Sequence, residues 1–274
     1  MASARSHSGQ PPGRKQPAYR FAAAVLKPPM MALASRDWPV AGPLATPGGV
    51  VVAVNHISHV DPLVVAHFLY DMDRPARFLA KSSLFETPVV GAVFRGAGQI
   101  EVHRESEGAA DSLREAVAAV RAGECVVIYP EGTISRDRAL WPMSGKTGAA
   151  RIAFETGCRV VPMGVWGPQQ LLGPYAKRPR LRPRPTMRIR LGAPVPLGDL
   201  QPEPGTAPTG AVLAAATDRI MDAITELVAG LRGQPAPAGR LDLHDEALAR
   251  IGDAHVDYDW AAIAGGVPHD RRPA

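Results

Sequence analysis

The sequence predicts a single α/β domain in which a mostly parallel sheet carries helices on both faces, preceded by a short amphipathic helical segment. From Gly49 onward, short apolar runs alternate with stretches of helical periodicity, the pattern of a sheet buried on both sides. The 274 residues are 46% hydrophobic and 21% charged, which suits one large globular domain and excludes wholesale disorder. Two cysteines, Cys125 and Cys158, cannot form a disulfide framework, which predicts a reduced, intracellular protein.

The N-terminal region divides into a basic stretch, residues 1–18, which we expect to be disordered, and an amphipathic stretch, residues 19–36. The second contains apolar side chains on either side of Pro28-Pro29, which predicts two short helical pieces. They are shorter than the roughly 20 residues that a membrane span requires. Such pieces can lie in the headgroup region of an anionic membrane, and packing on the protein's own core is an equally good interpretation.

The main domain is expected to cover residues 37–232. Val50–Val54 is an apolar run rich in β-branched residues and predicts a buried strand. Asp61 and Pro62 then begin a helix that continues to Tyr70, with Asp61 as its N-cap and Pro62 at its first position. The further strands expected are 77–80, 99–102, 125–129, 160–165 and, at an edge, 186–191, and the further helices are 88–95, 111–122, 145–156 and a long one with apolar positions from 213 to 231.

Charge is unevenly distributed over the chain, which has a net charge of +5. Residues 1–36 hold six bases and no acid, and residues 156–198 hold eight bases and no acid. Residues 233–274 form a Pro- and Gly-rich acidic tail that we expect to be largely disordered. A basic body implies an anionic partner, which can be a nucleic acid, a membrane or a phosphorylated substrate. Nucleic acid is not expected, because the chain has no recognisable binding motif and only 5% aromatic residues.

Polar residues follow the first buried strand, where ligands of parallel sheets gather. Residues 55–61 read Asn-His-Ile-Ser-His-Val-Asp. On a continuous helix, the side chains of His56 and Asp61 would point in different directions and would not share one face. In a turn, however, the Asp61 carboxylate can fold back onto the His56 imidazole and orient it as a base. A helix cap at Asp61 and a polar strand end at His56 would explain the same spacing. A metal site formed by His56, His59 and Asp61 is disfavoured because no further ligand is suitably spaced.

Two other strand ends carry groups that can hold an anion. In Tyr-Pro-Glu-Gly-Thr, residues 129–133, Gly132 permits a tight turn, and Thr133 with free backbone N–H groups can bind an oxyanion or phosphate. Glu131 can bind a hydroxyl or orient a cation. Arg104, after the strand at 99–102, has a guanidinium suited to phosphate. An ordinary polar turn and a surface ion pair are the alternatives at these two places.

Four segments together resemble the 1-acylglycerol-3-phosphate acyltransferase family, in matching order between Gly49 and Gly167. They are Asn-His-Ile-Ser-His-Val-Asp-Pro at 55–62, Lys81 with Leu84 and Phe85 followed by Gly-Gln-Ile-Glu-Val-His-Arg at 98–104, Tyr-Pro-Glu-Gly-Thr at 129–133, and Val-Pro-Met-Gly at 161–164. One such segment alone would be weak evidence for the resemblance, whereas four segments in matching order at compatible spacing are specific evidence for it.

The resemblance implies transfer of a fatty acyl group from acyl-CoA or acyl carrier protein to the free hydroxyl of 1-acylglycerol-3-phosphate. His56 would be the general base and Asp61 its orienting partner. The residues implied to hold the acceptor are Arg104, Glu131, Gly132 and Thr133, with Lys81 in the second segment. The resemblance implies no metal and no cofactor beyond the acyl donor. With the basic N-terminus, it predicts a peripheral protein on the cytoplasmic face of the cell membrane, without a transmembrane helix.

The chain departs from the family pattern at one position. The family commonly continues Glu-Gly-Thr with Arg and Ser, whereas Ile134 stands here in place of the Arg. Either Arg136 takes over the phosphate contact, or the acceptor is another one, such as glycerol-3-phosphate, a different lysophospholipid or a glycolipid. A catalytically idle lipid-binding protein of the same fold is the remaining alternative, and the presence of His56, Asp61 and Glu131 weighs against it.

Overall fold

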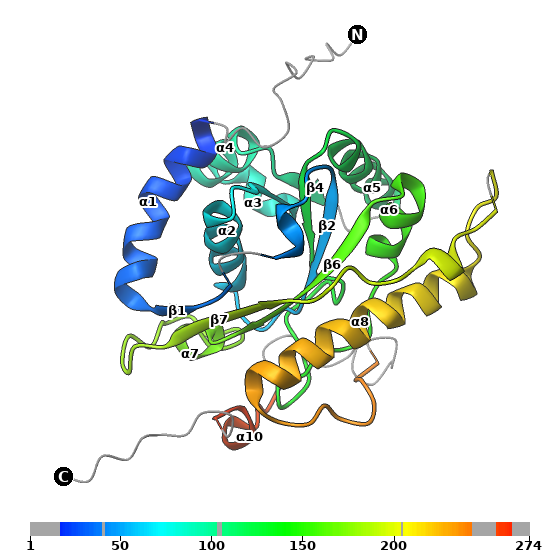
Figure 1. The fold of residues 1–274 in the computed structure, drawn as a ribbon. Helices are drawn as coiled ribbons and strands as arrows, with labels where there is room; N and C mark the ends of the chain where they lie inside the picture. Colours follow the sequence, from blue (N-terminus) through cyan, green and yellow to red (C-terminus); the bar gives the residue numbers. More distant parts are fainter. Residues whose placement is uncertain (1–16, 40–41, 103–105, 204, 243–255, 265–274) are drawn as a thin grey trace.

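The computed structural model describes residues 17–39, 42–102, 106–203, 205–242 and 256–264. A seven-stranded sheet forms the centre of the molecule, in the order β1-β7-β6-β2-β5-β3-β4 (Figure 1). All neighbouring strands are parallel except β6 and β7. The strands are β1 Ser35–Asp37, β2 Val50–Val54, β3 Ala76–Lys81, β4 Ile100–Val102, β5 Cys125–Ile128, β6 Arg159–Trp166 and β7 Thr186–Leu191.

Helices cover both faces of this sheet, which confirms the predicted fold class (Figure 1). Val51 and Ala53 of β2 pack toward α5, α6 and α8, whereas Val50, Val52 and Val54 pack toward α2. Both sets are buried, so the apolar run of β2 does not alternate with polar residues. The helices are α1 Pro17–Leu33, α2 Asp61–Asp71, α3 Ser82–Glu86, α4 Pro88–Gly96, α5 Ser106–Arg121, α6 Gly148–Thr156, α7 Pro168–Leu171, α8 Gly210–Arg232 and α10 Trp260–Ala264, with 3₁₀ turns at Pro43–Ala45 and Gly198–Leu200.

The expectation of an edge strand at 186–191 is wrong. The strand β1 lies outside β7 and pairs with it in parallel, with Ser35 opposite Thr186. The alternation in β7 arises because Met187 and Ile189 point into the core while their neighbours are more exposed. The sheet therefore begins at Ser35, inside the stretch 19–36 that was assigned to an amphipathic segment outside the main domain.

The helix α1 is continuous and contains Pro28 and Pro29, rather than forming two pieces. One side of α1 packs on the domain, where Tyr19 stacks on Tyr70 with ring centroids 5.9 Å apart and Lys27 pairs with Asp71 at 2.5 Å. Both contacts join the part of α1 that precedes the proline pair to the end of α2. The large apolar side chains of α1 that remain exposed are Phe21, Val25, Leu26 and Met31. Within the described residues, no helix has the length and apolar character needed to cross a membrane.

Within the tail that the sequence predicts to be largely disordered, residues 256–264 include α10 beside α8 (Figure 1). The side chain of Ile263 in α10 is only 3% exposed and belongs to the core cluster. The composition of the tail is acidic and Pro-rich on average. Three apolar side chains close together in sequence, Tyr258, Trp260 and Ile263, nevertheless give this short stretch a face that packs.

Candidate active site

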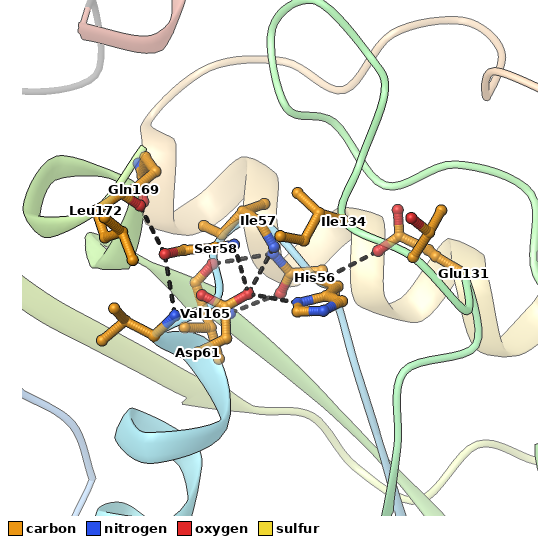
Figure 2. A network of polar contacts seen from close by, with 12 residues as sticks. His56, Ile57, Ser58, Asp61, Glu131, Ile134, Val165, Gln169 and Leu172 are labelled. Atoms are coloured by element: carbon orange, nitrogen blue, oxygen red, sulfur yellow. Dashed lines mark hydrogen bonds and ion pairs between the residues drawn. The ribbon is translucent and has the colours of Figure 1, made fainter. Parts of the chain in front are cut away.

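The candidate active site lies at the carboxyl ends of β2 and β5, where the β2–α2 turn (residues 55–60) meets the β5–α6 loop (residues 129–147) (Figure 2). The two strands are parallel neighbours, with Ala53 opposite Ile128, so both segments leave the sheet at the same edge. The α7–β7 loop (residues 172–185) comes from a more distant part of the chain and contacts both.

His56 and Asp61 form the ion-pair geometry that the sequence spacing suggested. His56 Nδ1 lies 2.9 Å from Asp61 Oδ2 (Figure 2). The same oxygen accepts the backbone N–H groups of Ile57 at 2.6 Å and Ser58 at 2.9 Å. Asp61 is fully buried, while 17% of the His56 side chain is exposed. A carboxylate held in this way accepts the Nδ1 proton and leaves Nε2 as the basic nitrogen.

Asp61 is not the N-cap that the sequence predicted. Val60 occupies the cap position and Asp61 is the first residue of α2, so its carboxylate turns back over the preceding turn instead of capping the helix. Because that carboxylate serves three N–H groups of the β2–α2 turn, its position is set locally. Its second oxygen, Oδ1, has no hydrogen-bond partner among the described residues.

Two polar side chains of the β2–α2 turn fasten it to neighbouring elements. The Asn55 amide donates to the carbonyl of Val165 at 3.0 Å and accepts the Val165 N–H at 2.8 Å, so it continues the β2–β6 pairing beyond the strand end. Ser58 Oγ donates to the carbonyl of Leu172 at 2.6 Å (Figure 2). The turn that carries His56 is therefore fixed to both β6 and the α7–β7 loop.

Glu131 is completely buried and binds backbone rather than an exposed ligand. Its Oε1 accepts the N–H of His56 at 2.8 Å, and its Oε2 accepts the N–H of Met143 at 3.1 Å. Burial raises the pKa of Glu131 to about 8, although these two hydrogen bonds act in the opposite direction. The sequence interpretation placed Glu131 among the acceptor-binding residues. The geometry instead makes it a link between the β2–α2 turn and the far end of the β5–α6 loop.

The Gly132–Thr133 part of the loop forms the expected tight turn, with Gly132 at a φ of 68°. The backbone N–H of Gly132 is not free, because it donates to the carbonyl of Tyr129 at 2.9 Å. The Thr133 hydroxyl lies 3.3 Å from Tyr175 Oη of the α7–β7 loop. The expectation of free backbone N–H groups is therefore wrong for Gly132. The polar group of this turn that lies beside another polar side chain is the Thr133 hydroxyl.

Tyr129 forms one wall beside the imidazole. Its ring centroid lies 4.4 Å from that of His56 at an interplanar angle of 31°. Burial raises the pKa of the Tyr129 phenol well above its ordinary value, so the ring stays neutral. The basic nitrogen of His56 therefore operates beside an aromatic face.

The remaining predicted residues are placed as follows. Arg104 lies outside the described residues, so the structure says nothing about it. Lys81 is exposed at the end of β3, at the same edge of the sheet. Arg136 is half-buried, and its backbone N–H donates to Met143 Sδ at 3.1 Å. Ile134, at the position where the family pattern has an Arg, is only 2% exposed.

Lys146 is a basic residue at the site that the sequence interpretation did not select. Its ammonium group lies beside Gly132, since a Cβ placed on Gly132 would be 3.1 Å from Lys146 Nζ. Its backbone N–H donates to Pro130 at 2.8 Å, which holds it against the Tyr-Pro-Glu-Gly-Thr turn. The side chain is exposed. Only the position of Lys146 at the end of the same loop could have suggested it from sequence.

The assembled groups suit base catalysis. An imidazole oriented by a buried carboxylate can take a proton from a hydroxyl, and the nearby Lys146 ammonium can attract an anionic part of the same molecule. Among the described residues, no three His, Cys, Asp or Glu side chains gather in a way that could hold a metal ion.

Comparison with known proteins shows a similarity that includes the segments carrying this site. The sequence model of the family described as Acyltransferase matches residues 40–166. The chain is 35% identical over 118 residues to a 1-acyl-sn-glycerol-3-phosphate acyltransferase of Borreliella burgdorferi, covering 43% of this chain and 45% of the relative. It is 31% identical over 123 residues to the chloroplastic 1-acyl-sn-glycerol-3-phosphate acyltransferase BAT2 of Brassica napus, covering 44% and 34%. The matched region thus spans less than half the length of either relative.

A solved structure has the same fold. It is the 1-acyl-sn-glycerophosphate (LPA) acyltransferase PlsC from Thermotoga maritima, with a TM-score of 0.55 over 80% of this chain and 81% of that one, at 20% identity. At this identity the likeness shows the fold alone. The family match includes β2, β5 and the segments that carry His56, Asp61 and Glu131. Over residues 40–166, this chain is similar to the acyltransferase family.

Proposed function

We propose that this protein transfers a fatty acyl group from a thioester donor to the free hydroxyl of 1-acylglycerol-3-phosphate, which gives phosphatidic acid. The observation that carries the proposal is the 2.9 Å contact between His56 Nδ1 and Asp61 Oδ2, made by a fully buried carboxylate and a partly exposed imidazole. The names of the curated relatives support the same acceptor. The donor is acyl-CoA or acyl carrier protein.

The proposed reaction uses His56 as general base. Asp61 accepts the Nδ1 proton, so Nε2 takes the proton from the acceptor hydroxyl while the hydroxyl oxygen bonds to the thioester carbonyl carbon. The carbon–sulfur bond then breaks, and the departing thiolate receives the proton from the imidazolium. The thioester is already activated, so alignment and a base account for the chemistry without a metal or an acyl-enzyme.

We assign the acceptor phosphate to the neighbourhood of Gly132. Lys146 Nζ supplies the positive charge there, and the Thr133 hydroxyl supplies a hydrogen-bond donor next to it. Ile134 points away from solvent, so residue 134 contributes no cation. This assignment replaces the Arg of the family pattern with a lysine 12 positions further along the chain, and it makes Arg136 the competing candidate.

We further propose that the protein acts as a peripheral protein on the cytoplasmic face of the cell membrane. The exposed apolar side chains of α1 support this, because Phe21 is 64% and Val25 54% exposed. The basic stretch that precedes β7 lies against the end of the same helix, since Arg184 donates to the carbonyl of Met31 in α1 at 2.5 Å and to that of Ala34 directly after it at 3.0 Å. An apolar helix face beside a basic loop suits an anionic leaflet.

The membrane proposal is tested by liposome flotation of a double variant, Phe21→Gln with Val25→Gln, against the matched control Phe21→Leu. Removing residues 1–36 would be a poor test, because it also removes two of the three residues of β1 from the sheet. We expect the double variant to lose most of its binding to anionic liposomes at low salt, and the control to bind as wild type does. Equal flotation of all three proteins would contradict the proposal.

The catalytic proposal is tested with labelled acyl-CoA and labelled acyl carrier protein against a panel of acceptors. The panel contains lysophosphatidic acid, glycerol-3-phosphate, lysophosphatidylcholine as a lysolipid with a capped phosphate, and a glycolipid. We expect the fastest transfer to lysophosphatidic acid, and transfer reduced by about 10²–10⁴-fold in a His56→Ala control. Transfer only to an acceptor without a phosphate monoester would overturn the assignment of the acceptor. An absence of transfer with every pair of substrates would leave a lipid-binding protein that keeps the fold.

A further inference from the structure

The C-terminal segment (residues 256–264) lies against both loops that flank the β2–α2 turn. On the β5–α6 loop, Tyr258 Oη donates to the carbonyl of Ser135 at 2.9 Å, and the N–H of Asp259 donates to the carbonyl of Arg138 at 2.7 Å. On the α7–β7 loop, the ring of Trp260 lies so close to Gly173 that a Cβ there would be 3.1 Å from its Cη2. One short segment therefore touches the two loops that border the site.

The contacts made by the C-terminal segment lead directly to His56. Ser135, whose carbonyl receives the Tyr258 hydroxyl, donates its own N–H to the carbonyl of His56 at 2.7 Å. The two loops also meet each other, since Tyr175 Oη lies 3.3 Å from Thr133 Oγ1 and 3.4 Å from the carbonyl of Ile134. Thr133 and Ile134 form the part of the loop beside which we place the acceptor phosphate.

The C-terminal segment is itself anchored in the core. Ile263 is 3% exposed, and the guanidinium of Arg232 donates to the carbonyl of Ala262 at 3.3 Å and to that of Ala139 at 2.7 Å. Arg232 lies over the rings of Trp141 and Trp166, 3.9 and 4.5 Å from their centroids. Burial lowers the pKa of Arg232 to about 10, which leaves it charged near pH 7. The end of α8 thereby joins the β5–α6 loop to α10.

We propose that the C-terminal segment positions the acceptor side of the site, with Tyr258 and Trp260 as positioning residues that hold the β5–α6 and α7–β7 loops together. This inference rests on the proposed function for its substrate, but the contacts that carry it are independent of that function. Loosening these contacts reduces the fraction of molecules whose loops are arranged for the acceptor, and the apparent KM for the acceptor rises in proportion. The donor and the His56–Asp61 pair, held by the β2–α2 turn itself, are affected much less.

The test compares Tyr258→Phe and Trp260→Ala in the full chain with a matched control, Asp257→Ala. The Asp257 carboxylate is 93% exposed and lies 3.3 Å from Arg138, so its loss should change little. We expect each of the first two variants to raise the acceptor KM about threefold to tenfold, with kcat and the donor KM within about twofold of wild type. Trypsin cleavage after Arg136 or Arg138 should also become faster in these two variants and remain unchanged in the control.

Two results would overturn the proposal. The first is an unchanged acceptor KM in both Tyr258→Phe and Trp260→Ala. The second is a parallel fall of kcat and both kcat/KM values with a lower Tm, which would mean that the segment only stabilises the fold. The trypsin comparison needs no substrate. If the wild type acylates no lysophospholipid, the proposed function fails, while unchanged cleavage at Arg136 and Arg138 would separately show that the segment does not hold the loop.

Discussion

The β2–α2 turn and the β5–α6 loop meet at the same site but are held in opposite ways. In the turn, a single oxygen of Asp61 accepts three N–H groups from residues that lie three to five positions earlier. The loop has local contacts of its own, since Asp137 Oδ1 accepts the N–H of Ala139 at 2.9 Å, but it is also bound by distant parts of the chain. Its Ser135 carbonyl is bound by Tyr258, 123 positions later, and its Ala139 carbonyl by Arg232, 93 positions later.

The difference suggests that the β2–α2 turn serves the proton transfer and the β5–α6 loop serves the recognition of the acceptor. The turn is also fastened to β6 and the α7–β7 loop, but the imidazole is oriented by a carboxylate of the same turn, which suits the part of the site that moves the proton. A loop held by remote contacts can be changed by altering those contacts, which suits the part that distinguishes acceptors. Local variants should therefore act on kcat, and variants of the loop should act mainly on the acceptor KM.

The largest effect is expected from His56→Ala in the turn. Removing the base should lower kcat by about 10²–10⁴-fold, the usual contribution of general-base catalysis, while the acceptor KM stays near its wild-type value. Acyl-transfer kinetics with lysophosphatidic acid measure both parameters, and circular dichroism checks the fold. Near-normal turnover by His56→Ala would remove the basis of the catalytic assignment.

Asp61 gives a finer test of the turn, because its two oxygens have different surroundings. In Asp61→Asn, the amide oxygen can keep the place of Oδ2 and its three N–H donors, while the NH₂ group takes the place of the unpartnered Oδ1. Only the negative charge that supports the imidazolium is then lost, and we expect kcat to fall about tenfold to thirtyfold.

Asp61→Ala is the matched comparison for this substitution. It removes the acceptor of all three N–H groups, so its kcat should approach that of His56→Ala. An Asp61→Asn enzyme as slow as Asp61→Ala would show that orientation does not survive in the amide, and that the carboxylate itself is required to hold the turn.

The same difference explains which parts of the molecule the sequence could predict. The His56–Asp61 pair depends on spacing within one turn, and the apolar run of β2 depends on burial, so both follow from adjacent residues. The pairing of β1 with β7 joins residues about 150 positions apart, and its three-residue strand has no alternation to mark it. The C-terminal segment reaches the site only through tertiary contacts, which no local pattern records, and for Lys146 the sequence offers only its position at the end of the β5–α6 loop.

Glu131 joins the two regions, so its removal should disturb both to an intermediate degree. In Glu131→Gln, the amide NH₂ faces either the His56 or the Met143 N–H, and one of these donors loses its acceptor. We expect kcat to fall about threefold to tenfold, and the free energy of unfolding at pH 5 to fall by about 1–3 kcal/mol. Kinetics and urea denaturation measure the two effects.

The pH dependence of the free energy of unfolding tests whether Glu131 is a buried carboxyl with a raised pKa. Burial raises the pKa of Glu131 from 4.5 to about 8, so between these values the folded protein keeps a proton that the unfolded chain releases. The stability that Glu131 contributes is therefore complete below about pH 4.5 and falls as the pH rises to about 8. The wild type should lose its advantage over Glu131→Gln across this range, and a constant difference between the two proteins would contradict the raised pKa.

The smallest effect is expected from Lys146→Ala, which tests recognition within the loop. Because the Lys146 side chain is exposed, losing its contact with the acceptor phosphate should raise the KM for lysophosphatidic acid by only about threefold to fivefold, with kcat unchanged. The KM for a lysolipid with a capped phosphate should rise less. Arg136→Ala is the matched control, and we expect it to be nearly silent. A larger rise in KM from Arg136→Ala than from Lys146→Ala would show that Arg136, rather than Lys146, contacts the acceptor phosphate. The cation that Ile134 lacks would then be supplied two positions along the chain, and not by the lysine at the other end of the loop.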